Sequence, residues 1–430
     1  MSTVIDQIEA APSALSRLTS DRTAKRIAAW CEAGLDATAV PFFPLLVLVP
    51  RGIAALVSMA GLCAAGLVLS TGARRPRPAL VVAAALLGCL LIWGTTSALW
   101  SADPVRSLVV AARLAGLFAI GLALAVAANL LRAPRRLIRL LLAGLVLGVA
   151  MAAIDLISGG LLGAPFTERS YQPAALNRAS VSFTILLLPM TAMLLRNGLA
   201  LGPLLFAAAT VATIFALAGT TAKAALIAGV PIGLLIYLSP SHVARMAAVL
   251  SVLLVVTAPL SFARLERIPA FAETADAVKL SAGHRLLIWS FAGDRIAERP
   301  LIGWGLDASR TIPGGSDPIR PGETWLPLHP HNAPLQLWLE LGVPGAVLFA
   351  LTVGLAWHAL AAAPWPQLFG AAAGASLAIA LIASFASYGI WQEWWLATLW
   401  FSLFAVLVMA RVAGTSGAAA AALRFTRVRS

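Results

Sequence analysis

Three of the five histidines in the 430-residue sequence lie in one polar segment between two apolar regions. His329 and His331 are separated by a single residue, and His284 precedes them in the same segment. Asn332 follows His331, and a helical pattern starts at Pro334, where proline is well tolerated in the first turn. A helix N-terminus disfavours the imidazolium cation, so we expect the His331 side chain to stay neutral near pH 7. Because a neutral imidazole can accept a proton, His331 is the candidate general base.

The neighbours of His331 each have two interpretations. Asn332 suits a helix N-cap as well as a substrate-binding residue, and His329 suits either a partner of the base or an ordinary loop residue. A zinc site built from the three histidines is an alternative, but H-x-H spacing is unspecific and no carboxylate is spaced to complete it. The outer segments contain no D-x-D motif and no paired carboxylates, which argues against a Mg²⁺-dependent reaction. The sequence thus predicts neither a metal nor another cofactor.

The segments on either side of these histidines must cross a membrane. Hydrophobic residues make up 60% of the sequence and charged residues 11%, whereas soluble domains carry roughly 25% charged residues. Eleven long apolar runs and a weaker one at 34–50 can each cross a hydrocarbon core of roughly 30 Å. The sequence therefore predicts an all-α polytopic membrane protein with about 12 transmembrane helices. The expected divisions are a lead-in at 1–33, spans one to nine at 34–262, a large loop at 263–343, the last three spans at 344–414 and a tail at 415–430.

The distribution of lysine and arginine orients these spans. With the N-terminus inside, the inner segments hold 17 Lys or Arg residues and the short outer segments hold four, in agreement with the positive-inside rule. Both termini are then cytoplasmic, and the large loop faces the other side. The first residues do not resemble a signal peptide, and Ile5–Trp30 is expected to form a partly amphipathic helix at the inner surface. The same rule explains much of the net charge of +13, so no nucleic-acid partner is expected.

The large loop carries basic residues of its own, and long loops are exempt from that rule. These residues are Arg264, Arg267, Lys279, Arg285, Arg295, Arg299, Arg310 and Arg320. They suit an anionic ligand such as a phosphate, or equally a solvated face on which the eight acidic residues between Ala263 and Ala333 balance them. Charge alone leaves both interpretations open.

Two further charged residues lie at the outer ends of spans. Arg113 lies inside an apolar run about two turns from its outer end, so it is either a functional residue or one that extends its guanidinium to the surface. Glu393 starts the last span, where it could orient His331 or bind an acceptor hydroxyl. Aromatic residues surround it, and for Trp391, Trp394 and Trp395 an interfacial belt is the favoured interpretation.

Two motifs resemble one known family. His331-Asn332, nine residues and then Gly342-Val343-Pro344-Gly345 resemble the H-N-x9-G-x-x-G pattern of bacterial O-antigen ligases. The segment Gly283-His284-Arg285, Trp289 and the run at 299–306 are similar to a loop segment of the same family. The resemblance implies a membrane glycosyltransferase of the C-type architecture in the bacterial inner membrane, with its site facing the periplasm. It also implies a glycan on undecaprenyl pyrophosphate as donor, a sugar hydroxyl of lipid A core as acceptor, and contact with membrane lipids.

The resemblance also implies roles for particular residues. His331 matches the family's catalytic histidine, and Arg285 matches a loop arginine that engages the donor pyrophosphate. Lys223 occupies the place of a further arginine of the family. The lysine keeps the positive charge but lacks the guanidinium, which can donate two parallel hydrogen bonds to one anion. Arg178 opens the sixth span in another segment similar to the family. With Arg113, these cations would stabilise a departing pyrophosphate.

The mechanism expected from these residues is metal-independent. His331 takes a proton from the acceptor hydroxyl, which attacks the anomeric carbon directly and inverts it. An O-antigen polymerase or a protein O-oligosaccharyltransferase of the same family is the first alternative. A membrane transporter is the second, although the sequence shows no half-to-half repeat.

Overall fold

The computed structural model describes residues 12–72, 77–166, 172–196, 200–278 and 280–427, and over these the chain is predominantly helical. The helices before the large loop are α2 (Pro12–Ala39), α3 (Phe42–Leu48), α4 (Ile53–Thr71), α5 (Pro78–Thr96), α6 (Pro104–Ala127), α7 (Pro134–Ile157), α8 (Asn177–Leu195), α9 (Leu201–Ala216), α10 (Thr220–Leu238), α11 (Pro240–Val256) and α12 (Ala258–Ser261). Those that follow are α13 (Pro269–Val278), α14 (Leu280–Glu298), α15 (Ala333–Ala362), α16 (Gln367–Ala386) and α17 (Glu393–Arg427). The predicted all-α class is confirmed.

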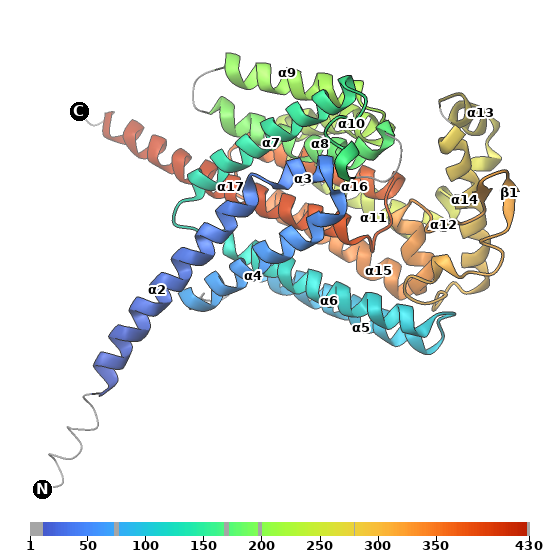
Figure 1. Ribbon diagram of the computed structural model, residues 1–430, viewed down its shortest axis with the longest axis horizontal. Coiled ribbons are helices and arrows are strands. Elements are labelled where there is room, and N and C mark those ends of the chain that lie inside the picture. The colour runs from blue at the N-terminus through green and yellow to red at the C-terminus, as the bar shows by residue number, and fades with distance from the viewer. Residues whose placement is uncertain (1–11, 73–76, 167–171, 197–199, 279, 428–430) are drawn as a thin grey trace, which may run out of the picture.

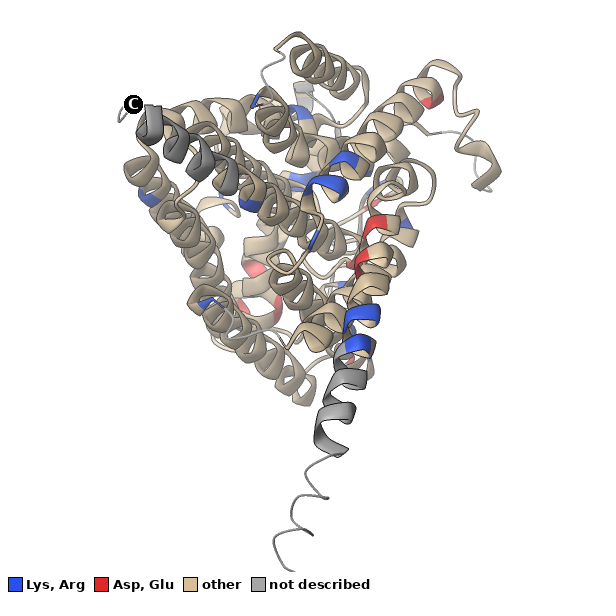
Figure 2. Ribbon diagram, turned by 90° about the vertical axis from the view of Figure 1, so that its left-hand side faces the viewer, with Lys and Arg blue, Asp and Glu red and all other residues tan. Residues whose placement is uncertain are grey.

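The described residues contain nine helices long and apolar enough to cross a membrane, or up to 11 if each of two bent pairs counts as one span. The pairs bend by 41° between α2 and α3 and by 69° after α11. The twelve predicted spans fall on these elements only when the shorter apolar helix α9 is counted as well. Most of the ribbon carries no charged residue, as an end-on view shows (Figure 2).

Local sequence explains where these helices begin and how closely they pack. Proline occupies the first turn of α5, α6, α7 and α11, where its missing N–H has no partner to lose. Glycine lets helices approach each other, because a Cβ on Gly121 would lie 1.9 Å from the Trp400 ring and one on Gly61 would lie 2.1 Å from Ile120. Small residues at such crossings are typical of helices that pack within a membrane.

The segment between α12 and α15 forms a separate lobe at one end of the molecule. It contains α13, α14 and the antiparallel strands β1 (Pro318–Arg320) and β2 (Glu323–Thr324). α2 begins and α17 ends at the opposite end (Figure 1). Two boundaries differ from the expectation. α2 runs without a break across the predicted division at residue 33, and part of the predicted loop at 263–343 is paired as strands. The start of the predicted helix Ile5–Trp30 lies outside the described residues.

Two glycine motifs, distant in sequence, meet where α15 is broken. Gly342 interrupts the helix with φ 61° and ψ −155°, a backbone conformation accessible essentially only to glycine. A Cβ on Gly342 would lie 2.5 Å from the Leu301 carbonyl oxygen, and one on Gly303 would lie 2.4 Å from the Glu340 backbone. The N–H groups of Trp304 and Gly305 donate to the carbonyls of residues 339 and 340 at 2.9 and 2.8 Å. The loop thus fixes the short helix at 333–341 that carries the site.

Candidate active site

His331 lies immediately before α15 in a left-handed backbone conformation, with φ 56°. Its Nδ1 is 2.6 Å from the Ser387 carbonyl oxygen. A carbonyl only accepts, so Nδ1 carries the proton and Nε2 keeps its lone pair. Burial lowers the pKa of His331 to about 4, and the nearby positive charge of Arg285 adds to this, while the hydrogen bond to Ser387 opposes it. His331 is therefore neutral near pH 7, as the sequence suggested, and burial is the main cause.

His329 is buried and supports His331. Its Nδ1 accepts a hydrogen bond from the His331 backbone N–H at 3.1 Å, and its Nε2 lies 2.9 Å from the Gln392 amide. The two imidazole rings are 4.2 Å apart between centroids. Burial, the neighbouring His331 and two arginines lower the pKa of His329 to about 2. A Cβ on Gly389 would lie 2.7 Å from the His329 ring, so only glycine leaves room for this arrangement.

Arg285 and Asn332 both lie near His331, but Arg285 contributes a positive charge and Asn332 caps a helix. Arg285, on α14, is half-buried, and burial lowers the pKa of its guanidinium. Its charge opposes the rise in the pKa of Tyr388, which burial raises to about 12. Asn332 is fully buried, and its Oδ1 accepts a hydrogen bond from the Leu335 N–H at 3.0 Å. Asn332 therefore caps α15, the structural alternative to substrate binding.

A polar cavity of about 500 Å³ lies beside the histidine pair, and His329 forms part of its wall. Its charged lining consists of five arginines and two carboxylates, namely Arg51, Arg106, Arg113, Arg178, Arg310, Asp307 and Glu393. Asp307 pairs with Arg106 at 2.6 Å and with Arg310 at 3.6 Å. Glu393 pairs with Arg113 at 2.9 Å. Five guanidinium groups facing two carboxylates leave an excess of positive charge, which suits an anionic ligand.

Two of the cavity arginines have no carboxylate partner among the described residues. They are Arg51, which lies between α3 and α4, and Arg178, in the first turn of α8. The Arg178 guanidinium lies over the Trp394 ring at 5.4 Å from its centroid, a cation–π contact that leaves its N–H groups available. These two side chains are therefore the ones best placed to bind an added anion.

The structure brings together most, but not all, of the residues that the sequence singled out. Arg113, Arg178, His329 and Glu393 line the cavity. Glu393 pairs with Arg113, whereas a backbone carbonyl orients His331, so the predicted contact between Glu393 and His331 is absent from the described residues. Lys223 lies in the first turn of α10 and outside the cavity lining. That turn adjoins the start of α8, because a Cβ on Gly219 would lie 3.2 Å from Asn177 Oδ1.

Sequence reasoning missed three of the cavity arginines. Arg51 and Arg106 were counted only as exceptions to the positive-inside rule, and Arg310 as one of eight loop cations. Exceptions to the positive-inside rule could have indicated two of these arginines. Four basic residues lie in the short outer segments against the general bias, and three of them line the cavity, namely Arg51, Arg106 and Arg178. The fourth, Arg169, lies outside the described residues.

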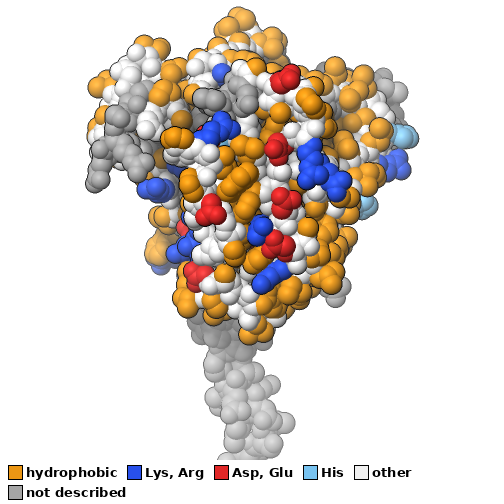
Figure 3. All heavy atoms as spheres, turned by 90° about the vertical axis from the view of Figure 1, so that its right-hand side faces the viewer, with side chains coloured by type: hydrophobic (Ala, Val, Ile, Leu, Met, Phe, Trp, Pro, Cys, Tyr) orange, Lys and Arg blue, Asp and Glu red, His pale blue; other side chains and the backbone are white. Residues whose placement is uncertain are grey.

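The outer surface of the lobe differs from the cavity. Acidic and basic side chains lie interspersed with hydrophobic ones on this face (Figure 3). Of the eight loop cations only Arg310 lines the cavity and Arg285 lies near His331, while Lys279 lies outside the described residues. Arg310 and Arg285 are thus the loop cations that lie at the candidate site. No group of three or more His, Cys, Asp or Glu side chains in the described part of the chain is arranged to hold a metal ion.

A second cavity, of about 330 Å³, adjoins the first and has no charged residue in its lining. Leu87 and Phe118 line it from α5 and α6, and Phe349 and Leu381 line it from α15 and α16. Trp391 lines both cavities. The polar and the apolar cavity therefore share the Trp391 side chain as a common wall.

Comparison with known proteins identifies the family of this region. Residues 205–350 match the O-antigen ligase family. This third of the chain is similar to an O-antigen ligase domain. His329, His331, Arg285 and Arg310 lie within this domain, whereas the other four cavity arginines come from outside it.

Three relatives are similar to part of the chain, and each is provisionally named a polysaccharide ligase. The protein of Rickettsia conorii is 39% identical over 126 residues, which are 28% of this chain and 30% of the relative. The protein of Rickettsia prowazekii is 38% identical over 129 residues, or 29% and 32%. That of Rickettsia bellii is 38% identical over 133 residues, or 30% and 32%. The chain thus matches about a third of the length of these relatives, and the sequence resemblance is confirmed at the level of the family.

Proposed function

We propose that this protein is a glycosyltransferase that moves a glycan from undecaprenyl pyrophosphate to a sugar hydroxyl of lipid A core. The observation that carries the proposal is an arginine-lined cavity whose wall includes His329, which accepts a hydrogen bond from the partly buried, neutral His331. Guanidinium groups bind phosphate oxygens through paired N–H donors. The adjoining apolar cavity suits the prenyl chain of such a donor. The O-antigen ligase domain supports the reaction class.

In the proposed reaction His331 acts as the general base. Nε2 takes the proton from the acceptor hydroxyl while the hydroxyl oxygen attacks the anomeric carbon of the donor sugar. The bond between that carbon and the pyrophosphate oxygen breaks, and its electron pair stays on the pyrophosphate. Arg178 and the other cavity arginines stabilise the charge that develops there. A single displacement inverts the anomeric carbon, and no step requires a metal ion.

The other sequence-predicted residues take supporting roles in this proposal. Arg285 and Lys223 extend the cationic surface toward the pyrophosphate, while Asn332 and His329 hold His331 in place. Glu393 keeps Arg113 directed at the cavity through their ion pair. We place the regions at 34–262 and 344–414 in the bacterial inner membrane, with the segment at 263–343 in the periplasm.

The experiment uses purified protein in lipid nanodiscs with a lipid-linked glycan donor and lipid A core as acceptor. We expect His331→Ala to lower the transfer rate by about a thousandfold, within the range for removal of a general base. His242→Ala is the matched control, because His242 is exposed and remote from the cavity. We expect EDTA to leave the wild-type rate unchanged. A His331→Ala variant as active as wild type would overturn the proposal, and transfer to a second glycan instead of lipid A core would identify a polymerase.

A further inference from the structure

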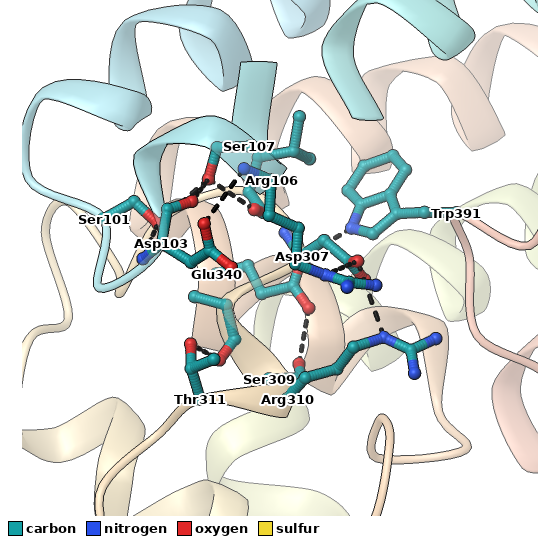
Figure 4. A network of polar contacts seen from close by, with 12 residues as sticks. Ser101, Asp103, Arg106, Ser107, Asp307, Ser309, Arg310, Thr311, Glu340 and Trp391 are labelled. Carbon is teal, nitrogen blue, oxygen red and sulfur yellow. Dashed lines mark hydrogen bonds and ion pairs between the residues drawn. The ribbon is translucent and has the colours of Figure 1, made fainter. Parts of the chain in front are cut away.

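A fully buried carboxylate, Glu340, lies on α15 behind the wall of the polar cavity. Neither its position in the H-N-x9-G motif nor the proposed reaction gives it a task. Figure 4 shows it at the centre of a polar network that joins the start of α6, the segment at 307–311 and Trp391. A buried charge without partners would be strongly destabilising. The partners of Glu340 therefore indicate what it is for.

Four groups donate hydrogen bonds to the two oxygens of Glu340. The Asp307 N–H and the Trp391 Nε1 both donate to Oε2 at 2.6 Å. The Ser309 hydroxyl and the Gln336 amide, the latter at 3.0 Å, donate to Oε1. Four donors suit the ionised carboxylate, because a protonated oxygen would present its own hydrogen to a donor.

Three of the four donors belong to residues that line the polar cavity, namely Asp307, Gln336 and Trp391. Asp307 is held in a left-handed conformation, with φ 57°, and its carboxylate in turn pairs with Arg106 and Arg310. Trp391 separates the polar cavity from the apolar one. One carboxylate thus connects the arginine wall of the polar cavity with the wall that the two cavities share.

We propose that Glu340 is a positioning residue that holds Asp307, and through it Arg106 and Arg310, in the geometry that binds the pyrophosphate of the donor. The inference rests on the proposed function, because it assumes that the cavity binds pyrophosphate. Glu340 touches no substrate. Its effect on the reaction is transmitted through the residues that donate hydrogen bonds to its carboxylate.

The test measures binding of inorganic pyrophosphate to the full-length protein by calorimetry, which requires no transfer activity. Glu340→Gln keeps the shape but turns an amide N–H₂ toward at least one of the four donors. We expect it to weaken pyrophosphate binding about tenfold, which corresponds to about 1.4 kcal/mol. Asp155→Asn is the matched control. Asp155 is also buried and accepts two backbone N–H bonds at 2.9 Å, but it lies outside the cavity lining.

Both variants should lower the unfolding temperature, since each disturbs a buried carboxylate, but only Glu340→Gln should change pyrophosphate affinity. If Glu340→Gln does not fold, Ser309→Ala decides, because it removes one donor, keeps the carboxylate and alters no cavity-lining residue. We expect two- to threefold weaker binding for it. Wild type, Glu340→Gln and Ser309→Ala with equal affinities would overturn the inference alone. Wild-type binding that is absent, or unaffected by Arg178→Ala, would instead overturn the proposed function and the inference with it.

Discussion

Two clusters of charged residues in this molecule consist of the same residue types but differ in their balance of charge. Where α2 meets the connection between α6 and α7, Glu32 accepts the N–H groups of residues 132 and 133 at 2.7 Å, and Asp36 accepts from Arg136 Nε at 2.7 Å. Here the carboxylates are buried, while the Arg136 side chain is 55% exposed. At the polar cavity, by contrast, five arginines face two carboxylates. The first cluster is complete in itself, whereas the second has positive charge left over for a ligand.

The balance of charge around a site therefore says more about ligand binding than the presence of ion pairs does. A buried carboxylate that is fully hydrogen-bonded ties elements together, and removing its partner is destabilising. A guanidinium held over an aromatic ring, as Arg178 is over Trp394, keeps its donors free for a ligand. Substitutions in the two clusters should therefore have opposite effects on stability and activity.

Among substitutions outside the histidine pair, the largest expected effect separates the two clusters directly. Arg178→Ala should lower kcat/KM for transfer about a hundredfold, as the loss of one preorganised charge stabiliser does in other enzymes, with little change in the unfolding temperature. Arg136→Ala should lower the unfolding temperature, because it leaves Asp36 buried without its guanidinium, and should leave kcat/KM unchanged. Steady-state kinetics and thermal unfolding of the two purified variants check this. The reverse pattern would show that the comparison is wrong.

A smaller effect is expected from crowding the histidine pair. Gly389→Ala adds a Cβ that would lie 2.7 Å from the His329 ring, so His329 and the His331 backbone that donates to it must shift. We expect the transfer rate to fall about tenfold, since misplacing a catalytic group by even 1 Å can cost about a hundredfold. Gly116→Ala is the control, because a Cβ there meets no atom within 4 Å. Equal rates for both variants would mean that the position of His329 does not matter.

The smallest expected effect is on the pH dependence. The pKa of His331 is lowered to about 4, so its neutral form dominates throughout the range from pH 8 to pH 6. We expect kcat/KM to change less than twofold over this range and to fall only as the pH approaches 4. An imidazole with an ordinary pKa near 6.5 would keep only about a quarter of its neutral form at pH 6. A fourfold fall between pH 8 and pH 6 would contradict the buried environment of His331.

The same shifts predict how stability depends on pH. His329 and His331 are neutral in the folded protein, with pKa values lowered to about 2 and about 4, whereas the unfolded chain takes up protons on both below about pH 6.5. Because the unfolded state then binds more protons, the free energy of unfolding should decrease as the pH falls from about 6.5 toward 4. Denaturant unfolding at several pH values checks the sign. His329→Phe, which cannot titrate, should show a shallower decrease.

The sequence predicted well those features that depend on local pattern. The predicted apolar runs correspond to the long apolar helices of the structure. The helix start beside His331 follows from residue types within a few positions of each other. The neutrality of His331 was also expected, but its main cause, burial, depends on residues far away in sequence.

What the amino-acid sequence alone determined about this protein is its helical membrane fold, the lobe between α12 and α15, and the resemblance carried by His331 and its motif. These features are encoded in short stretches of hydropathy and spacing. Only the tertiary structure decided that Arg51, Arg106, Arg178 and Arg310 face one cavity and that Glu340 lies behind its wall. Contacts between residues such as Arg106 and Asp307, which are 201 positions apart, arise from how the helices pack, and no local pattern records them.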